Sequence, residues 1–445
     1  MPPTEIEEVI TILLAAVESE RLVIVSGAGL SMPEPSDLPS ARELAAHCAN
    51  KHAMVSGDVL SDELREDIEA QAQYFRERAQ LESYFLERLV DWKPFFGEPN
   101  EGHYAIADLL LCRAADLSVS ANVDTLVERA AEELGETDFE ACIRGSEAAV
   151  PRHYQPLLKI HGCARRGRRD TLWCREQLQE PEWQARILDT ARWLTGRLSE
   201  RDLVFVGYWT DWAYLNEVLA QVIENGRPRS VTLIDPSPPE ALRAKAPDLW
   251  NWAHRDGIAF HHLQIPGTEF LQKLRHRFSY LLLKRIAAVG AEAFERNTSS
   301  PCPSFPILDS SSNEDLYDLR RDWSGVRRDQ VTRRRDAEPS DELLSKTLCD
   351  LLAAGAITDG ALFITNGRRV RLFQASGRML YTVKAELSGD TTSFDAPEVT
   401  VCVGAYDDGG VPENLVRSGR GSTIIRPGIS GEWCTHEKAN DILGI

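Results

Sequence analysis

The sequence predicts an α/β protein with a doubly wound parallel sheet, an inserted helical layer and a second, smaller α+β domain. Three observations carry this prediction. Short apolar runs alternate with long amphipathic stretches, a segment rich in Ser and Pro follows them, and a β-hairpin signal comes after that segment. At 445 residues the chain is also too long for one ordinary core,.

Five apolar runs predict the strands of the first sheet. They read LVIVS, LSVS, LLKI, LVFV and VTLI, at 22–26, 117–120, 157–160, 203–206 and 231–234. Strands that are apolar along their whole length are typical of a parallel sheet covered on both faces, so we expect a Rossmann-like arrangement. Roughly ninety residues of helix-like sequence separate the first two runs, which is more than one crossover needs,. We therefore expect a helical insertion at about 40–110.

The segment NTSSPCPSFPILDSSSNED at 297–315 is the expected linker,. It separates a predicted first domain at 1–296 from a C-terminal α+β domain at 316–445. In the latter, 316–355 is expected to be helical and 361–387 to form a β-meander, with Asn366-Gly367 as the main hairpin turn and Ser376-Gly377 as a weaker one,.

The composition narrows the class of protein. The net charge of −19 repels nucleic acid and anionic membranes over most of the surface,. No apolar stretch approaches the ~18 residues that a membrane span needs, and the acidic N-terminus reads as an amphipathic helix and not as a signal peptide,. We therefore expect a cytoplasmic protein whose nine cysteines are reduced,.

The first strand runs directly into the loop Ser26-Gly27-Ala28-Gly29-Leu30-Ser31. Two glycines let backbone amides approach a phosphate, as in other glycine-rich loops that follow strands. The alternative is a tight turn between a strand and a helix. Since ligands of open α/β sheets bind at the carboxyl ends of the strands, this loop is a candidate phosphate site.

Polar residues follow the second and third strands in the same way. Asn122 and Asp124 come two positions apart after 117–120, and His161-Gly162 ends the run at 157–160. Asn122 and Asp124 could contact a bound sugar and its leaving group, or could simply cap the following helix. His161 is a titratable group at the mouth of the expected pocket.

The fourth and fifth strands end in Gly207 and Asp235. A glycine at one edge and a carboxylate after a late strand suit an adenosine, because the carboxylate can accept hydrogen bonds from ribose hydroxyls. Taken alone, Asp235 fits a turn residue equally well.

The order of these motifs resembles the sirtuin family of NAD-dependent enzymes over roughly residues 20–240. The matching pieces are Gly27-Ala28-Gly29-x-Ser31, Pro99-Asn100-x-x-His103, Asn122-x-Asp124-x-Leu126, His161-Gly162 and Gly207. The resemblance implies that NAD is bound, with its pyrophosphate at the glycine loop. It implies further that Asn122 and Asp124 flank the nicotinamide riboside and that His161 is the catalytic base.

The chain also departs from the deacylating members of that family. These carry a structural zinc on two Cys-x-x-Cys pairs after the His-Gly, whereas no Cys-x-x-Cys occurs in this chain. Cys163 and Cys174 cannot build the usual four-ligand site, so no zinc is expected and both read as packing residues. The peptide-gripping segment is missing after His161 as well; Phe95-Phe96-Gly97-Glu98-Pro99 lies before it and is assigned to the helical layer.

A sirtuin core without these parts resembles the sirtuin-like NAD hydrolases of bacterial anti-phage systems. That resemblance implies an NAD+ glycohydrolase that yields ADP-ribose and nicotinamide and depletes NAD in abortive infection. Two alternatives remain: an NAD-dependent protein deacylase, and a catalytically silent NAD or ADP-ribose sensor that acts as a scaffold.

The C-terminal domain is expected to mediate assembly, as a homo-oligomer or with a partner such as a nucleic-acid-handling ATPase. An arginine-rich stretch between Arg320 and Arg335 could meet an acidic partner, a phosphate or nucleic acid,. The alternative is a solvated helix paired with Asp318, Asp322 and Asp329. The hairpin at 361–373 could extend a sheet across subunits.

Overall fold

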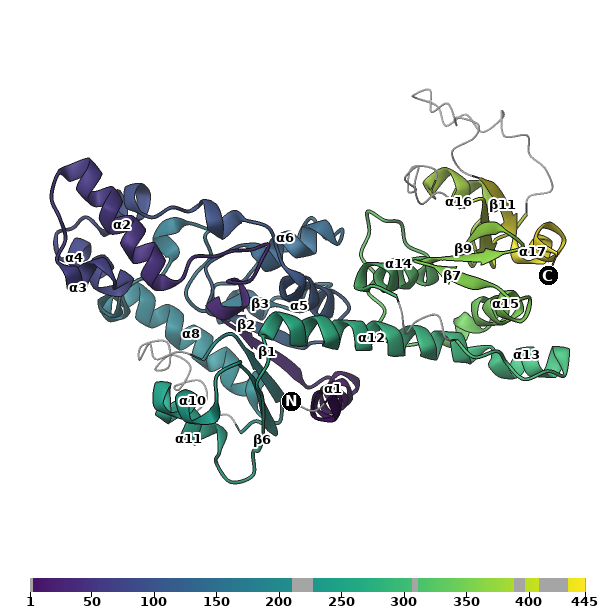
Figure 1. Ribbon diagram of the computed structural model, residues 1–445, viewed down its shortest axis with the longest axis horizontal. Helices are drawn as coiled ribbons and strands as arrows, with labels where there is room; N and C mark the ends of the chain where they lie inside the picture. The colour runs from purple at the N-terminus through teal and green to yellow at the C-terminus, as the bar shows by residue number, and fades with distance from the viewer. Residues whose placement is uncertain (1–2, 210–226, 306–310, 388–396, 408–430, 445) are drawn as a thin grey trace. The chain divides into compact units, whose positions relative to one another are not determined.

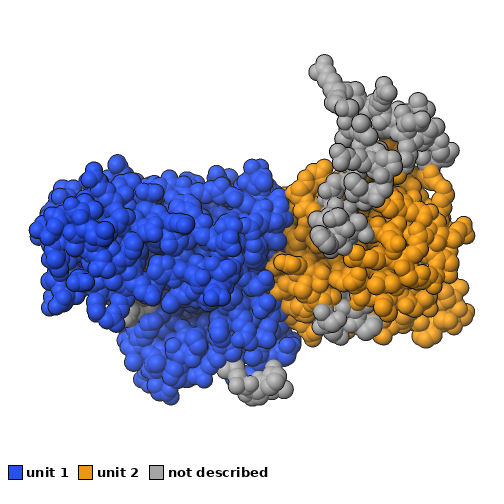
Figure 2. Space-filling model, turned by 45° about the horizontal axis from the view of Figure 1, so that its top comes forward, with its two compact units in different colours: residues 1–274 blue, residues 275–445 orange. Residues whose placement is uncertain are grey.

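The computed structural model describes residues 3–209, 227–305, 311–387, 397–407 and 431–444 (Figure 1). The chain divides into two compact units, residues 1–274 and 275–445 (Figure 2). The division falls inside the helix α12 (Gly267–Val289), whereas the sequence suggested an end of the first domain at 296. Residues 275–296 therefore belong to the second compact unit.

The first unit is built on a six-stranded parallel sheet in the order β3-β2-β1-β4-β5-β6. Its strands are β1 (Leu22–Ser26), β2 (Leu117–Ser120), β3 (Leu157–Lys159), β4 (Asp202–Val206), β5 (Ser230–Ile234) and β6 (Ala259–Leu263). The strand order changes direction between β1 and β4, so the loops after these two strands diverge and open a crevice at the carboxyl edge. The doubly wound, Rossmann-like fold is thereby confirmed.

The sequence did not predict β6. This strand reads AFHHL, is only partly buried and lies at the edge of the sheet next to β5. Because most of its residues are not fully buried, this strand has no continuous apolar run,. The five predicted runs, by contrast, were recognisable because every residue of each strand is buried, including those of β3 at the opposite edge of the sheet.

A helical layer fills the chain between β1 and β2, as expected. Its main helices are α2 (Ala41–Ser56), α3 (Asp62–Arg65), α4 (Ile68–Glu77), a π-helix (Leu81–Leu89) and α5 (Glu101–Leu111). Ser40 starts α2, because its hydroxyl accepts from the Glu43 amide at 3.3 Å while the Glu43 carboxylate accepts from the Ser40 amide at 2.9 Å,. The core of the layer is aromatic: the rings of Phe75 and Phe85 stack with centroids 5.5 Å apart.

Of the other described α-helices of the first unit, α1 precedes β1 and the rest lie in the connections between strands (Figure 1). They are α1 (Pro3–Glu18), α6 (Leu126–Glu133), α7 (Gly145–Ala148), α8 (Pro181–Leu198), α10 (Pro239–Lys245) and α11 (Pro247–Ala253). Among the described residues of the whole chain, no helix combines the length and the apolar character that crossing a membrane requires.

The second unit contains a five-stranded mixed sheet in the order β11-β10-β9-β8-β7. Its strands and helices are α13 (Ala291–Thr298), α14 (Asn313–Ser324), α15 (Glu342–Ala353), β7 (Ile357–Asp359), β8 (Leu362–Thr365), β9 (Arg368–Gln374), α16 (Leu380–Leu387), β10 (Val399–Val403), β11 (Glu432–Thr435) and α17 (His436–Leu443). The separate small α+β domain is thus confirmed as a fold.

The hairpin of the second unit joins β8 to β9 through Asn366 and Gly367, both with positive φ (49° and 76°), as the sequence predicted,. The predicted meander is wrong beyond this point, because Ser376-Gly377 leads into α16 and not into a third strand. The outer side of β8 is paired with β7, so the edge strands among the described residues are β7 and β11.

The arginines between 320 and 335 do not form a continuous basic surface. Arg320 is fully buried, with its guanidinium 5.0 Å from the centre of the Phe278 ring. Most of the others have acidic partners: Arg321 and Arg328 pair with Asp318, Arg327 with Asp329, and Arg334 with Asp341. Burial and pairing leave little of this charge for a phosphate backbone, which favours the alternative of paired surface charges.

Candidate active site

The loops after β1, β2, β3, β4 and β5 meet around one cleft of about 530 Å³. Seven of the ten sequence-predicted site residues line it: Gly27, Ala28, Gly29, Asn122, His161, Gly207 and Asp235. The other three, Ser26, Ser31 and Asp124, are buried outside its lining. The volume lies within the range typical of small-molecule sites, ~300–1,000 Å³.

The glycine loop packs directly on the loop after β4. The Gly27 amide donates to the Val206 carbonyl at 3.2 Å, and the Gly29 amide donates to the Gly207 carbonyl at 3.0 Å. A Cβ on Gly27 would lie 2.7 Å from the Gly207 oxygen, and Gly207 itself has φ +61°. The glycines are therefore required by the close approach of two backbones at the switch point of the sheet, in addition to leaving room for a ligand.

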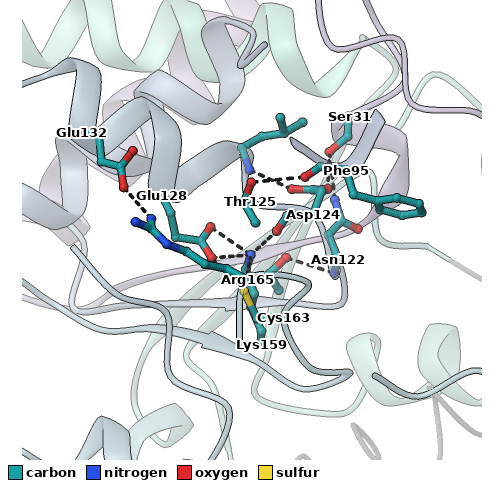
Figure 3. A network of polar contacts seen from close by, with 12 residues as sticks. Ser31, Phe95, Asn122, Asp124, Thr125, Glu128, Glu132, Lys159, Cys163 and Arg165 are labelled. Carbon is teal, nitrogen blue, oxygen red and sulfur yellow. Dashed lines mark hydrogen bonds and ion pairs between the residues drawn. The ribbon is translucent and has the colours of Figure 1, made fainter. Parts of the chain in front are cut away.

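Ser31 organises the side chains of the β2 loop. The Asn122 amide Nδ2 donates to Ser31 Oγ at 2.9 Å, and Ser31 Oγ donates to Asp124 Oδ2 at 3.0 Å (Figure 3). His103 Nε2 lies 3.0 Å from the same oxygen. Because His103 Nδ1 accepts from the Asn100 amide at 3.1 Å, the ring proton is on Nε2 and donates to Ser31,.

His103 was not among the predicted site residues. Burial lowers its pKa to about 4, so at neutral pH it is the neutral donor that this arrangement requires,. The sequence signal was its place in the motif Pro99-Asn100-x-x-His103. Nothing in the sequence alone connects that motif to Ser31, seventy-two positions away.

His161 is a titratable group that lines the cleft. Its Nδ1 lies 2.7 Å from the Ala121 carbonyl oxygen. A carbonyl only accepts hydrogen bonds, so Nδ1 carries the proton and Nε2 keeps its lone pair. The residue is 4% exposed, and burial lowers its pKa to about 4 with a further contribution from the charge of Arg186. At neutral pH it is therefore a neutral imidazole, with its one ring proton on Nδ1, and it can accept a second proton at Nε2.

Arg186, on α8, supports the loop that carries His161. Its Nε donates to the Ile143 carbonyl at 2.7 Å, Nη1 to the Asp170 carbonyl at 3.0 Å and Nη2 to the Lys159 carbonyl at 3.3 Å. Burial lowers its pKa to about 10, which still leaves the guanidinium charged near pH 7. One arginine thus links three segments of the chain. Its role could not be predicted from the sequence, because Arg186 lies within an ordinary amphipathic helix.

A buried ion pair lies behind the β2 loop. Lys159, the last residue of β3, contacts both carboxylate oxygens of Glu128 at 2.7 and 2.8 Å (Figure 3). Its ammonium group also donates to the Asp124 carbonyl, and Cys163 Sγ donates to Glu128 Oε1 at 3.2 Å. The sequence signal was visible but unused: a lysine inside the otherwise apolar run LLKI.

Asp235 lies at the far end of the cleft, after β5. Its Oδ1 accepts from the Ser237 amide at 2.8 Å, which shapes the turn that follows the strand,. Both residues and Lys245 line the cleft. Asp235 therefore acts as a turn residue and also lines the cleft, so the two sequence interpretations are compatible.

Among the described residues, no group of three or more His, Cys, Asp and Glu side chains is arranged to hold a metal ion. Cys163 and Cys174 are both buried. Cys174 packs in the core of the helical layer, whereas Cys163 contacts the buried ion pair. Cys174 is therefore a packing residue, whereas Cys163 also donates a hydrogen bond to the buried Glu128 carboxylate.

Residues 116–257 match the family model of the SIR2-like domain. This segment runs from β2 to the end of α11 and contains Asn122, His161, Gly207 and Asp235. The match supports the sirtuin resemblance over this part of the chain. A comparison with curated proteins found no match.

Solved structures of Sir2 proteins are similar to the chain at low identity. A Sir2 enzyme studied for its mechanism and regulation is 18% identical, with 61% of this chain and 96% of that chain covered and a TM-score of 0.32. A Sir2 homologue in complex with NAD is 16% identical, with 59% and 91% covered and a TM-score of 0.30. Sir2Tm bound to a propionylated peptide is 14% identical, with 60% and 98% covered and a TM-score of 0.30.

Proposed function

We propose that the protein is an NAD+ glycohydrolase, in which NAD+ and water give ADP-ribose, nicotinamide and a proton. The observation that carries the proposal is the state of His161 in the cleft. The Ala121 carbonyl holds Nδ1–H at 2.7 Å, so the lone pair is on Nε2 in the same cleft that Asn122 lines. A base and a polar positioning group thus stand beside a glycine-rich loop.

The cleft offers separate places for the two halves of NAD+. In the proposal, Gly27 to Gly29 and Gly207 hold the pyrophosphate, and Asp235 accepts from hydroxyls of the adenosine ribose,. Ser26 and Ser31 are buried outside the lining of the cleft, and in the proposal they stabilise the conformation of the glycine loop. Asn122 and His161, at the ends of β2 and β3, hold the nicotinamide riboside.

Cleavage breaks the bond between the ribose C1′ and the nicotinamide nitrogen, and its electron pair neutralises the departing pyridinium ring. The ribose is left as an oxocarbenium-like centre, which water attacks. The Asn122 amide Nδ2 is held by Ser31 Oγ, and in the proposal its carbonyl oxygen orients the water and a ribose hydroxyl. Because a water bonding to such a centre becomes strongly acidic, the weakly basic His161 can receive its proton.

The proposal gives Asp124 an indirect role. The family resemblance implies that Asp124 flanks the nicotinamide riboside, and a direct contact with the nicotinamide carboxamide was one possible role, but both of its carboxylate oxygens have protein partners, Ser31 Oγ and the Leu126 amide. Asp124 therefore orients Ser31, which in turn orients Asn122. Contact with the leaving group is left to residues that line the cleft.

Water is the proposed acceptor because the peptide-gripping segment and the cysteine pairs of deacylating sirtuins are missing from the sequence. The resemblance to anti-phage NAD hydrolases leads us to propose NAD depletion during infection as the biological role. Such an activity requires restraint, and we propose that the second unit supplies it through assembly, either of copies of this chain or with a nucleic-acid-handling ATPase.

The test compares NAD+ cleavage by the full-length protein with cleavage by Asn122→Ala, His161→Gln and a control, His254→Gln. His161→Gln keeps a donor for the Ala121 carbonyl but has no basic nitrogen. We expect both site variants to lose about 100-fold or more in kcat, the size usual for a lost acid–base group. His254 is exposed on α11, so its variant should match the wild type.

The outcome distinguishes the alternatives. Wild-type rates in both site variants would refute the mechanism. Binding of NAD+ without nicotinamide release, with or without a partner, would favour a sensor, and release that depends on an acylated peptide would favour a deacylase.

A further inference from the structure

The ion pair between Lys159 and Glu128 is enclosed completely by the first unit. Each side chain is only 1% exposed. Burial opposes the charge on the ammonium, but the Glu128 carboxylate, with smaller contributions from Cys163 and Asp124, outweighs it and raises the lysine pKa to about 12. Lys159 is therefore charged, and the pair joins β3 to α6 behind the cleft.

Such a pair contributes little to stability by itself. Desolvating two charges costs about as much as their attraction returns, and apolar residues of similar size often serve as well. The lysine, however, makes one contact that an apolar residue could not replace. Its third donor position is occupied by the Asp124 carbonyl, which precedes the first turn of α6.

We propose that Lys159 is a positioning residue that fixes the backbone of the β2 loop and so places the Asn122 amide for NAD+ cleavage. The inference rests on the proposed function, since it assigns a role to that loop in the same reaction. Asn122 is two residues before the carbonyl that the ammonium holds. Without that contact the carbonyl would be buried with no charged donor, and the loop would change its conformation to find another.

Lys159 also connects the loop that carries Asn122 to the loop that carries His161. Its own carbonyl accepts from Arg186 Nη2 at 3.3 Å, and its amide donates to the Cys142 carbonyl at 2.8 Å. His161 follows only two residues later. One residue therefore holds the Asn122 loop with its side chain and anchors the His161 loop with its backbone, which fixes the spacing between the two groups.

The test removes the charge pair as a whole. Lys159→Met combined with Glu128→Leu leaves no buried unpaired charge, so the fold is expected to survive with a melting temperature close to that of the wild type. The kcat for NAD+ should fall about 100-fold, because small displacements of reacting groups cost that much. KM should change less than threefold, since the glycine loop and Asp235 are untouched.

Two controls separate positioning from stability. Glu128→Gln keeps the lysine and its contact with the Asp124 carbonyl, and should retain kcat within about fivefold even if the protein melts earlier. Arg21→Met with Asp202→Asn alters an ion pair at the amino ends of β1 and β4, where Arg21 Nε and Asp202 Oδ2 are 3.0 Å apart. This variant should leave kcat unchanged. A wild-type kcat in the double variant at Lys159 and Glu128 would overturn the proposal.

A second measurement does not depend on activity. The Asn122 amide donates to Ser120 Oγ at 3.1 Å and the Thr125 amide to the Phe95 carbonyl at 2.9 Å, so both are protected from hydrogen exchange. In the double variant, exchange in residues 121–125 should accelerate at least tenfold while β1 stays protected. Unchanged protection would refute the positioning role even if the wild type cleaved no NAD+, a result that would separately refute the proposed function.

Discussion

Acidification from pH 7 to pH 5.5 should destabilise the first unit through His161. The pKa of this buried ring is lowered to about 4 in the folded protein, compared with ~6.5 in an unfolded chain,. As the pH falls through 6.5, the unfolded chain binds a proton that the folded protein does not. The stabilising contribution is therefore complete above about pH 6.5 and is lost progressively as the pH falls toward 4.

The expected magnitude follows from the two pKa values. At pH 5.5 about nine-tenths of the unfolded chains carry the proton and almost none of the folded ones do, so the free energy of unfolding is about 1 kcal/mol lower than at pH 7. His103, whose pKa burial also lowers to about 4, adds a similar amount. His161→Gln removes one of the two contributions and should halve their combined effect.

Hydrogen exchange of peptides from β1 and β4 in the full-length protein, corrected for the intrinsic exchange rate, measures this free energy at both pH values. The wild type should lose about 1 kcal/mol more than His161→Gln between pH 7 and 5.5. Equal losses in the two proteins, or a His161 resonance that titrates near pH 6.5, would refute the reasoning.

Three further predictions concern zinc, the switch-point loop and assembly. Elemental analysis should find no stoichiometric zinc, because the chain has no Cys-x-x-Cys pair; one zinc per chain would contradict this,. Gly207→Ala should lower the free energy of unfolding by about 2 kcal/mol or more in urea titrations, because φ is +61° and the new Cβ would lie 2.4 Å from the Leu30 amide nitrogen,. A stability equal to that of the wild type would show that the loops adapt. Ile357→Lys, at the 62% exposed first residue of the edge strand β7, should reduce the molar mass found by light scattering if the second unit assembles through this edge,; an unchanged oligomer would exclude that edge.

Most of the first sheet could be predicted because every residue of β1 to β5 is buried, which leaves continuous apolar runs in the sequence. The edge strand β6 has no such signature. The division between the compact units has no sequence signature because it falls inside the helix α12, whereas the Ser/Pro-rich segment at 297–315 lies within the second unit.

The residues of the cleft were predictable because they directly follow strands, and parallel strands bring their carboxyl ends to one edge. The residues that hold them were not, since their roles depend on partners far along the chain. Arg186 bonds three carbonyls from α8, and His103 reaches Ser31 from the helical layer. Lys159 is the exception, because a charge inside an apolar strand can be read in the sequence as a buried ion pair.

The proposed function requires that water in this cleft cleaves the nicotinamide–ribose bond. The most direct measurement is NAD+ cleavage by the full-length protein, with its activating partner where one is required, in water enriched in oxygen-18. We expect one nicotinamide and one ADP-ribose per NAD+, with the heavy oxygen on the ribose carbon that carried the nicotinamide, and loss of both products in His161→Gln. Products that form at the wild-type rate in His161→Gln, or a ribose carbon whose new oxygen comes from an acyl group and not from the solvent, would refute the proposed function.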